Sequence, residues 1–205
     1  MIRKTVFGFG VAMTALLIGT VLWFWAHDML GDHSQSVALQ KAVQPYMTPR
    51  RASFSLVDHT GQVVTEKTYK GRMLLVYFGY TECTDVCPYD LTAVSGALDQ
   101  LSEAMAAKMQ PIFVTIDPDI DTPELLGRYR KLFHPSLAAL TGTKAQVTAA
   151  ARAFGASTEK EPPTPFSPHD HAANLFLVNP TGDFLRVIRT PTTSDEVATI
   201  LRLYM

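Results

Sequence analysis

Hydrophobic residues in this chain come in short blocks separated by turn residues, and the pattern within the blocks alternates between strand and helix. β-Branched and aromatic blocks predict strands at residues 53–57, 62–66, 73–78, 111–116, 137–140, 173–178 and 183–188. Helices are predicted at residues 88–107 and 144–154, after the N-cap Thr122, and after the capping box formed by Thr193 and Glu196. This order predicts an α/β fold in which helices cover a mixed sheet that ends in an antiparallel hairpin.

The first block is of another kind, because it is long and uncharged. Residues 5–26 carry no charge, and 22 helical residues are long enough to cross a hydrocarbon core of roughly 30 Å. Arg3 and Lys4 precede this block, whereas no cation follows it before Lys41. The positive-inside rule then leaves the N-terminus in the cytoplasm and the rest of the chain outside it. We expect residues 1–26 to be a single-pass anchor in a bacterial inner membrane, with the soluble domain in the periplasm, and a mitochondrial inner membrane is the other candidate.

A cleaved signal peptide is the alternative interpretation of this block. Its apolar core would have about 7 to 15 residues and would end in small residues of the A-x-A kind. The observed block is longer and ends in Trp23-Phe24-Trp25, which resembles an interfacial aromatic belt. The polar residues 27–49 are predicted to be a tether, and residues 50–205 are enough for one domain with its own core.

Charge along the chain is balanced, with 18 Lys and Arg residues against 19 Asp and Glu residues. No basic run after the first block is longer than a pair such as Arg50-Arg51. Proteins that bind nucleic acid carry a basic patch or stripe, so no nucleic-acid partner is expected here. Contact with a membrane is expected only through the N-terminal block.

The chain contains two cysteines, Cys83 and Cys87, which place all its thiol chemistry in one turn. They follow the strand predicted at residues 73–78, and a helical pattern runs over residues 85–98. If the helix begins at or before Cys83, the i,i+4 spacing puts both sulfurs on one helix face about one turn apart. A helix N-terminus favours the thiolate, which is the form that binds metal or attacks a disulfide.

A second candidate segment contains two histidines near a run of prolines. Four prolines at positions 162–168 predict a stiffened loop that delivers His169, Asp170 and His171 to the strand after it. Side chains at i and i+2 share one side of an extended chain, so the two histidines are expected to point the same way. From these residues alone, solvent exposure and metal binding remain equally open for them.

Three acids, Asp117, Asp119 and Asp121, resemble a site for a hard cation. Pro118 and Pro123 divide this segment into turns, however, so strand-end and helix-cap roles are the preferred interpretation. These acids are therefore not among the predicted metal ligands.

Three separated motifs occur in order between residues 50 and 205. They are Gly79-Tyr80-Thr81-x-Cys83-x-Asp85-Val86-Cys87-Pro88, Ile116-Asp117-Pro118 with Asp121-Thr122-Pro123-Glu124, and Asp170-His171 followed by Leu177 and Pro180-x-Gly182-x-Phe184. In these motifs the chain resembles the Sco/SenC family of copper proteins. The resemblance implies a thioredoxin-like domain after a membrane anchor. It also implies one copper ion bound by Cys83, Cys87 and His171, with Asp170 as the acid beside that histidine.

The resemblance further implies a function. By it, the chain would be a membrane-anchored copper metallochaperone that assists assembly of the dinuclear copper centre of cytochrome c oxidase. Its partners would be the copper-containing subunit of that oxidase and another copper chaperone. The chain departs from the family where Thr84 replaces the usual Pro and where Glu82 adds a charge before Cys83. Both departures alter the turn and its electrostatics without removing a ligand.

The chemistry of these ligands agrees with the resemblance. Two thiolates and one imidazole form a soft three-coordinate ligand set suited to Cu(I). Cu(II) can bind the same three ligands when an oxygen ligand is added. The alternative from the enzyme class is a thiol-disulfide oxidoreductase in which Cys83 and Cys87 form a redox-active disulfide. Redox proteins of the thioredoxin type use Cys-x-x-Cys, however, and the additional residue here changes the geometry of the couple. A structural zinc site that adds His169 and His171 has an unsuitable His-x-His spacing, and a peroxidase would carry Pro in place of Tyr80.

Overall fold

The computed structural model describes residues 19–20, 23, 51–158 and 174–205. The helical residues Gly19, Thr20 and Trp23 belong to one structural unit, and the folded domain belongs to a second, Pro45–Met205. No helix within the described residues is both long and apolar enough to span a bilayer. The anchor predicted at residues 1–26 lies, apart from those helical positions, outside the described residues.

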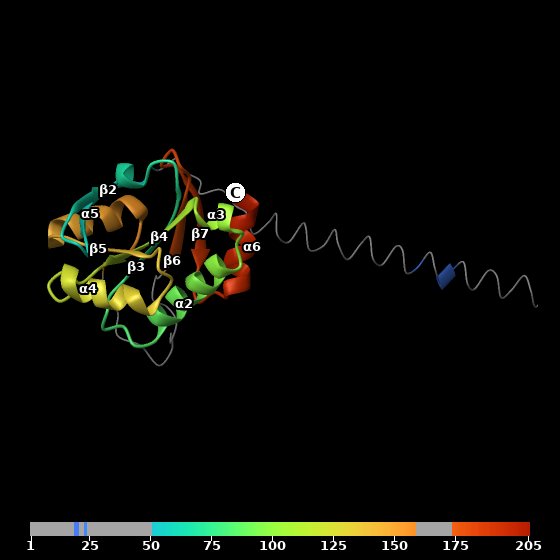
Figure 1. Cartoon of the computed structure of the whole chain (residues 1–205), viewed down its shortest axis with the longest axis horizontal. Helices are drawn as coiled ribbons and strands as arrows, with labels where there is room; N and C mark the ends of the chain where they lie inside the picture. The colour runs from blue at the N-terminus through green and yellow to red at the C-terminus, as the bar shows by residue number, and fades with distance from the viewer. Residues whose placement is uncertain (1–18, 21–22, 24–50, 159–173) are drawn as a thin grey trace, which may run out of the picture. The chain divides into compact units, whose positions relative to one another are not determined.

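Seven strands of the described residues form one mixed sheet (Figure 1). They are β1 (Ser55–Asp58), β2 (Val63–Thr65), β3 (Met73–Gly79), β4 (Met109–Thr115), β5 (Ala138–Thr141), β6 (Asn174–Val178) and β7 (Phe184–Arg189). Across the sheet the order is β2-β1-β5-β4-β3-β6-β7. Strand β4 pairs in parallel with β3 and β5, whereas the other neighbouring strands are antiparallel. The predicted mixed sheet is confirmed, and each strand ends within two residues of its predicted bounds.

The helices of this domain, within the described residues, differ from the prediction at one place. They are α2 (Val86–Asp99), α3 (Glu103–Ala106), α4 (Pro123–Tyr129), α5 (Lys144–Phe154) and α6 (Ser194–Tyr204), with 3-10 turns η1 (Glu66–Tyr69) and η2 (Arg130–Leu132). The single helix predicted at residues 88–107 is wrong, because α2 ends at Asp99 and α3 follows separately. Leu101 is buried in the core, and Ser102 takes the extended backbone of an N-cap. The Ser102 side chain makes no capping hydrogen bond, so the break coincides with the burial of Leu101 rather than with a local cap.

The predicted helix ends are confirmed at three places. Thr122 caps α4 by accepting a backbone N–H of the first turn, and Pro123 occupies the first helical position. Thr193 and Glu196 form the capping box of α6. Gly155 ends α5 with a φ of 72°, in the left-handed region that favours glycine.

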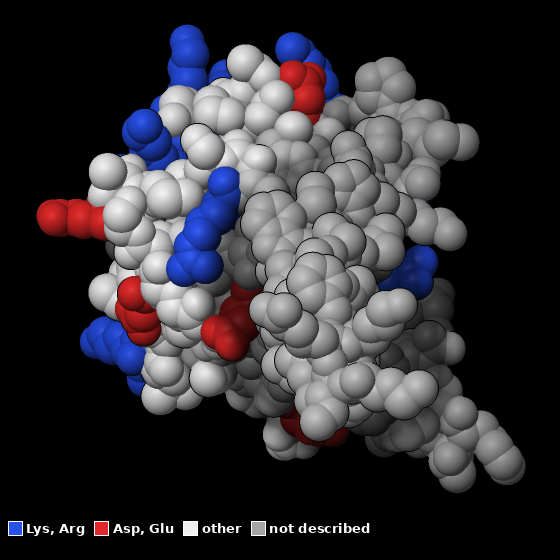
Figure 2. Space-filling model, turned by 90° about the vertical axis from the view of Figure 1, so that its right-hand side faces the viewer, with Lys and Arg blue, Asp and Glu red and all other residues white. Residues whose placement is uncertain are grey.

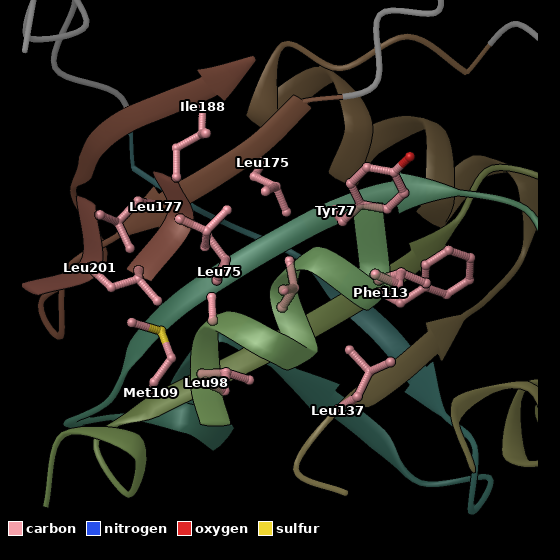
Figure 3. Close-up of a cluster of buried hydrophobic side chains, with 14 of the residues drawn as sticks. Leu75, Tyr77, Leu98, Met109, Phe113, Leu137, Leu175, Leu177, Ile188 and Leu201 are labelled. Carbon is pink, nitrogen blue, oxygen red and sulfur yellow. The ribbon is translucent and has the colours of Figure 1, made fainter. Parts of the chain in front are cut away.

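Both faces of the sheet are buried. Side chains alternate along β3, so Leu75 and Tyr77 lie on one face and Leu74 and Val76 on the other. The first face packs against α2 and α6, and Figure 3 shows the side chains of this cluster, with Leu98 of α2 among them. The second face packs against α5. Helices thus cover both faces of the sheet. Because β3, β4 and β5 are parallel, their carboxyl ends lie at one edge of the sheet, where α/β proteins place their binding sites.

Candidate metal centre

The two cysteines lie just beyond the carboxyl end of β3, around the turn that leads into α2. Gly79 is the last residue of β3, and the chain there passes directly against the thiol of Cys87. A Cβ atom added at Gly79 would lie 2.9 Å from the Cys87 sulfur and 3.0 Å from ring carbons of Tyr77 and Phe113. Glycine therefore allows a close approach of the strand to the thiol that a side chain would block.

The cysteines occupy different positions relative to α2. The helix begins at Val86, so Cys83 precedes it and Cys87 lies in its first turn. The condition under which one helix face would carry both sulfurs, a helix that begins at or before Cys83, is therefore not met. The turn nevertheless brings the residues together, because the backbone N–H of Cys87 donates to the Cys83 sulfur over 3.4 Å. Both are free thiols, with Cys87 buried and Cys83 half-buried.

The two thiols differ in acidity. A hydrogen bond from the Cys87 thiol, together with the backbone N–H groups of residues 85–87, lowers the pKa of Cys83 to about 5. Partial burial opposes this effect but does not overcome it. The same hydrogen bond and burial raise the pKa of Cys87. At neutral pH the turn therefore holds a Cys83 thiolate that accepts a hydrogen bond from a neutral Cys87 thiol.

Two further polar side chains, Tyr77 and Asp90, are buried close to Cys87. Burial raises the pKa of Asp90 to about 6. Within the described residues, both carboxylate oxygens of Asp90 and the hydroxyl of Tyr77 are buried without a hydrogen-bond partner. Burial, with the neighbouring Cys87 and Asp90, also raises the pKa of Tyr77. Sequence analysis missed both residues. The available signal was an acid three positions after Cys87, on the apolar side of a helix.

Asp121 is the buried one of the three acids Asp117, Asp119 and Asp121. It connects β4 to the cysteine turn, which we define as residues 80–87 between β3 and the first turn of α2. Its carboxylate accepts the Thr81 backbone N–H over 3.1 Å, the Thr81 hydroxyl, and the Thr115 hydroxyl over 2.5 Å. The helix-cap role expected here belongs to Thr122 instead. Among the described residues, no three His, Cys, Asp or Glu side chains gather closely enough to hold a metal ion.

Comparison with known proteins identifies the chain's family. The family model described as SCO1/SenC matches residues 43–205. The chain belongs to the SCO1/SenC family. This confirms the resemblance that the three motifs carry.

Two SCO1/SenC relatives illustrate the extent of the similarity. The chain is 36% identical over 155 residues to the human protein named SCO1 homolog, mitochondrial, which covers 74% of this chain and 52% of that protein. It is 34% identical over 156 residues to Protein sco1 of Schizosaccharomyces pombe, which covers 74% of this chain and 59% of that protein. The match therefore spans little more than half the length of these relatives.

A solved SCO1/SenC structure shares the fold. Bradyrhizobium japonicum ScoI, solved with copper bound, superposes on this chain with a TM-score of 0.62 and 32% sequence identity. The superposition covers 76% of this chain and 99% of that one. The predicted thioredoxin-like mixed sheet with flanking helices is thus also the fold of a copper-containing relative.

The third ligand predicted for this SCO1/SenC chain belongs to the segment His169-Asp170-His171, which lies outside the described residues. The structure does show where the next strand starts. Strand β6 begins at Asn174, and Leu175 pairs with Tyr77 in antiparallel register. The start of β6 therefore lies beside the carboxyl end of β3, which leads into the cysteine turn.

Charge on the SCO1/SenC domain is mixed on the face drawn in Figure 2. Basic and acidic side chains lie interspersed there, without a continuous area of one sign among the described residues. Long-range steering of a polyanion requires a surface dominated by positive charge. The described residues that are visible on that face form no such surface.

Proposed function

We propose that this chain is a copper metallochaperone that helps to assemble the dinuclear copper centre of cytochrome c oxidase. One observation carries the proposal: the cysteine turn holds a Cys83 thiolate against a Cys87 thiol at the same end of the sheet where β6 begins. Soft thiolate ligands at such an edge suit Cu(I). Family membership and the copper-bound structures of Bradyrhizobium japonicum ScoI and yeast Sco1 support the same choice of metal.

The proposed ligands are Cys83, Cys87 and His171. Position 171 precedes Asn174 by three residues, and three residues span at most about 10 Å of chain. A histidine there can reach the end of β3 because β6 starts beside that end. Asp170 is proposed as the acid that orients the imidazole, as carboxylates do for many metal-bound histidines.

Copper would enter this site as cargo rather than as a resident cofactor. Cys83 is ready to bind, because it is already ionised at neutral pH. Cys87 must first lose its proton, and its burial limits exchange with water. Metal binding therefore releases a proton, so affinity for copper rises with pH.

The proposal includes a location and partners. Residues 1–26 are proposed to anchor the chain in a bacterial inner membrane, with residues 27–49 as a tether and the thioredoxin-like domain in the periplasm. The charge asymmetry around the uncharged block supports this orientation. The proposed partners are the copper-containing subunit of the oxidase, as acceptor, and another copper chaperone.

A thiol-disulfide oxidoreductase is the second candidate function. The same turn favours it, because a thiolate with a pKa of about 5 beside a protonated thiol is the arrangement of an exchange couple. The two functions are compatible, since an acceptor with two cysteines must be reduced before it binds copper.

The deciding experiment uses His171→Ala, which leaves both thiols intact. A metallochaperone with this change should fail to assemble the oxidase at limiting copper, as Cys83→Ser or Cys87→Ser should. An oxidoreductase should remain active with His171→Ala and lose activity only with the cysteine variants. His169→Ala is the matched control, because it removes a histidine from the same segment. Normal oxidase assembly with His171→Ala would contradict the metallochaperone proposal.

A further inference from the structure

The carboxylate of Asp121 is buried, with 1% of the residue exposed, and binds residues that are far away in the sequence. One oxygen accepts the hydroxyl of Thr81, and the other accepts the Thr81 backbone N–H and the hydroxyl of Thr115. A buried carboxylate is costly unless it is hydrogen-bonded in this way. The acid therefore joins Thr81 to the end of β4 just beyond Gly79 and Thr115, the last pair of the β3–β4 ladder.

Thr81 is the residue through which this acid reaches the thiols. It lies two positions before Cys83, and the Cys83 backbone N–H donates to the carbonyl oxygen of Tyr80 over 3.2 Å. The start of the turn is also tied to β4, because the Ile116 N–H donates to the carbonyl oxygen of Gly79 over 2.7 Å. Asp121 adds a further attachment, since its carboxylate accepts from both the backbone N–H and the hydroxyl of Thr81.

The segment that carries Asp121 is itself held in place. The Asp121 N–H donates to the carbonyl oxygen of Asp117 over 2.9 Å, and the Asp117 N–H donates to the Thr115 hydroxyl over 2.9 Å. The loop from β4 to α4 is thus closed on itself before it binds Thr81. A turn held against such a closed loop has few ways to relax.

We propose that Asp121 is a positioning residue for the cysteine turn: through Thr81 it sets the place of the Cys83 sulfur relative to Cys87. The hydrogen bonds of the Asp121 carboxylate go to Thr81 and Thr115 and not to either sulfur, so it acts through the turn. The proposal rests on the proposed function where it concerns copper. Where it concerns the geometry of the two thiols, it stands on the hydrogen bonds alone.

The carboxylate accepts two donors of Thr81 and one of Thr115. An asparagine accepts hydrogen bonds at one oxygen and carries two donors on its nitrogen. In Asp121→Asn the oxygen can take the place of Oδ2 and keep the Thr81 N–H and the Thr115 hydroxyl, while the nitrogen donates to a rotated Thr81 hydroxyl. Asp121→Asn should therefore keep the turn in place, whereas Asp121→Ala removes all three hydrogen bonds.

The test compares Thr81→Val with Thr115→Val in the full-length protein. Each variant removes one hydroxyl that donates to the same carboxylate, but only Thr81 belongs to the cysteine turn. The measurements are Cu(I) affinity by competition with a chelator, the thiol-disulfide equilibrium of the copper-free protein with glutathione, and thermal unfolding. Asp121→Ala and, as its conservative control, Asp121→Asn are measured alongside.

We expect Thr81→Val and Asp121→Ala to weaken Cu(I) binding by about 10- to 100-fold, the range typical of lost support around a metal site. The same variants should shift the glutathione equilibrium by about tenfold. Thr115→Val should unfold at a similarly lowered temperature but keep both thiol properties near those of the wild type. Asp121→Asn should stay near the wild type in both thiol properties. If Asp121→Ala does not fold, Thr81→Val decides the outcome.

Two results would overturn the proposal. One is that Thr81→Val lowers the unfolding temperature but leaves the glutathione equilibrium unchanged. The other is that Thr115→Val changes that equilibrium as much as Thr81→Val does. If the wild type binds no Cu(I), the proposed function fails, and the glutathione equilibrium of the copper-free protein still decides the role of Asp121.

Discussion

Replacing Gly79 with alanine tests whether the site depends on the close approach of β3 to Cys87. The added Cβ would lie 2.9 Å from the sulfur and 3.0 Å from the rings of Tyr77 and Phe113, whereas carbon contacts are most favourable at about 3.5 to 4.0 Å. Both rings are almost completely buried and cannot move aside freely. Overpacking of this kind costs about 1 to 3 kcal/mol. In a domain of this size, about 2 kcal/mol lowers Tm by about 4 to 8 °C.

Thermal unfolding of the copper-free, reduced full-length protein measures this loss. Gly127→Ala is the matched control, because a Cβ at Gly127 in α4 would meet its nearest neighbour at an ordinary 3.7 Å. Alanine there should stabilise the protein by up to about 1 kcal/mol through its helix propensity. Only Gly79→Ala should also weaken Cu(I) binding, since the Cys87 sulfur must shift. A Gly79→Ala protein with the Tm and Cu(I) affinity of the wild type would refute the reasoning.

Four other predictions follow from the site and the N-terminal block. Because folding lowers the Cys83 pKa from about 9 to about 5, thiolate absorbance should disappear as the pH falls through about 5, and the stability that the thiolate contributes should be lost as the pH falls from about 9 to about 5. Burial raises the Asp90 pKa to about 6, so the wild type should lose stability as the pH rises through about 4 to 6. Asp90→Asn should remove that slope in unfolding free energy, and equal slopes would contradict the prediction. Chelator competition should show that His171→Ala weakens copper binding by about 10- to 100-fold, with a smaller effect from His169→Ala, and the reverse order would move the ligand to position 169. Intact-mass measurement should find residues 1–26 retained apart from Met1, and a chain that begins near residue 27 would indicate a signal peptide.

Much of the fold was predictable because its signals are local. The caps of α4 and α6 depend on residues at most three positions apart, and each strand corresponds to one apolar block. The break between α2 and α3 was not predictable in this way. It occurs where Leu101 is buried, and burial depends on how the helix meets the sheet. The helical pattern of the sequence continues through Ser102 and does not indicate that a helix ends before it.

The sequence by itself determined where the thiols are and which chemistry they permit, because the spacing of Cys83 and Cys87 and the motif around them are local properties. Only the tertiary structure decided which of the two is the thiolate, since both have the same ordinary pKa before burial and hydrogen bonding separate them. It alone also placed Asp121 against Thr81, 40 positions away. Hydrogen bonds and desolvation act between segments that are distant along the chain, and such contacts leave no periodic pattern in the sequence.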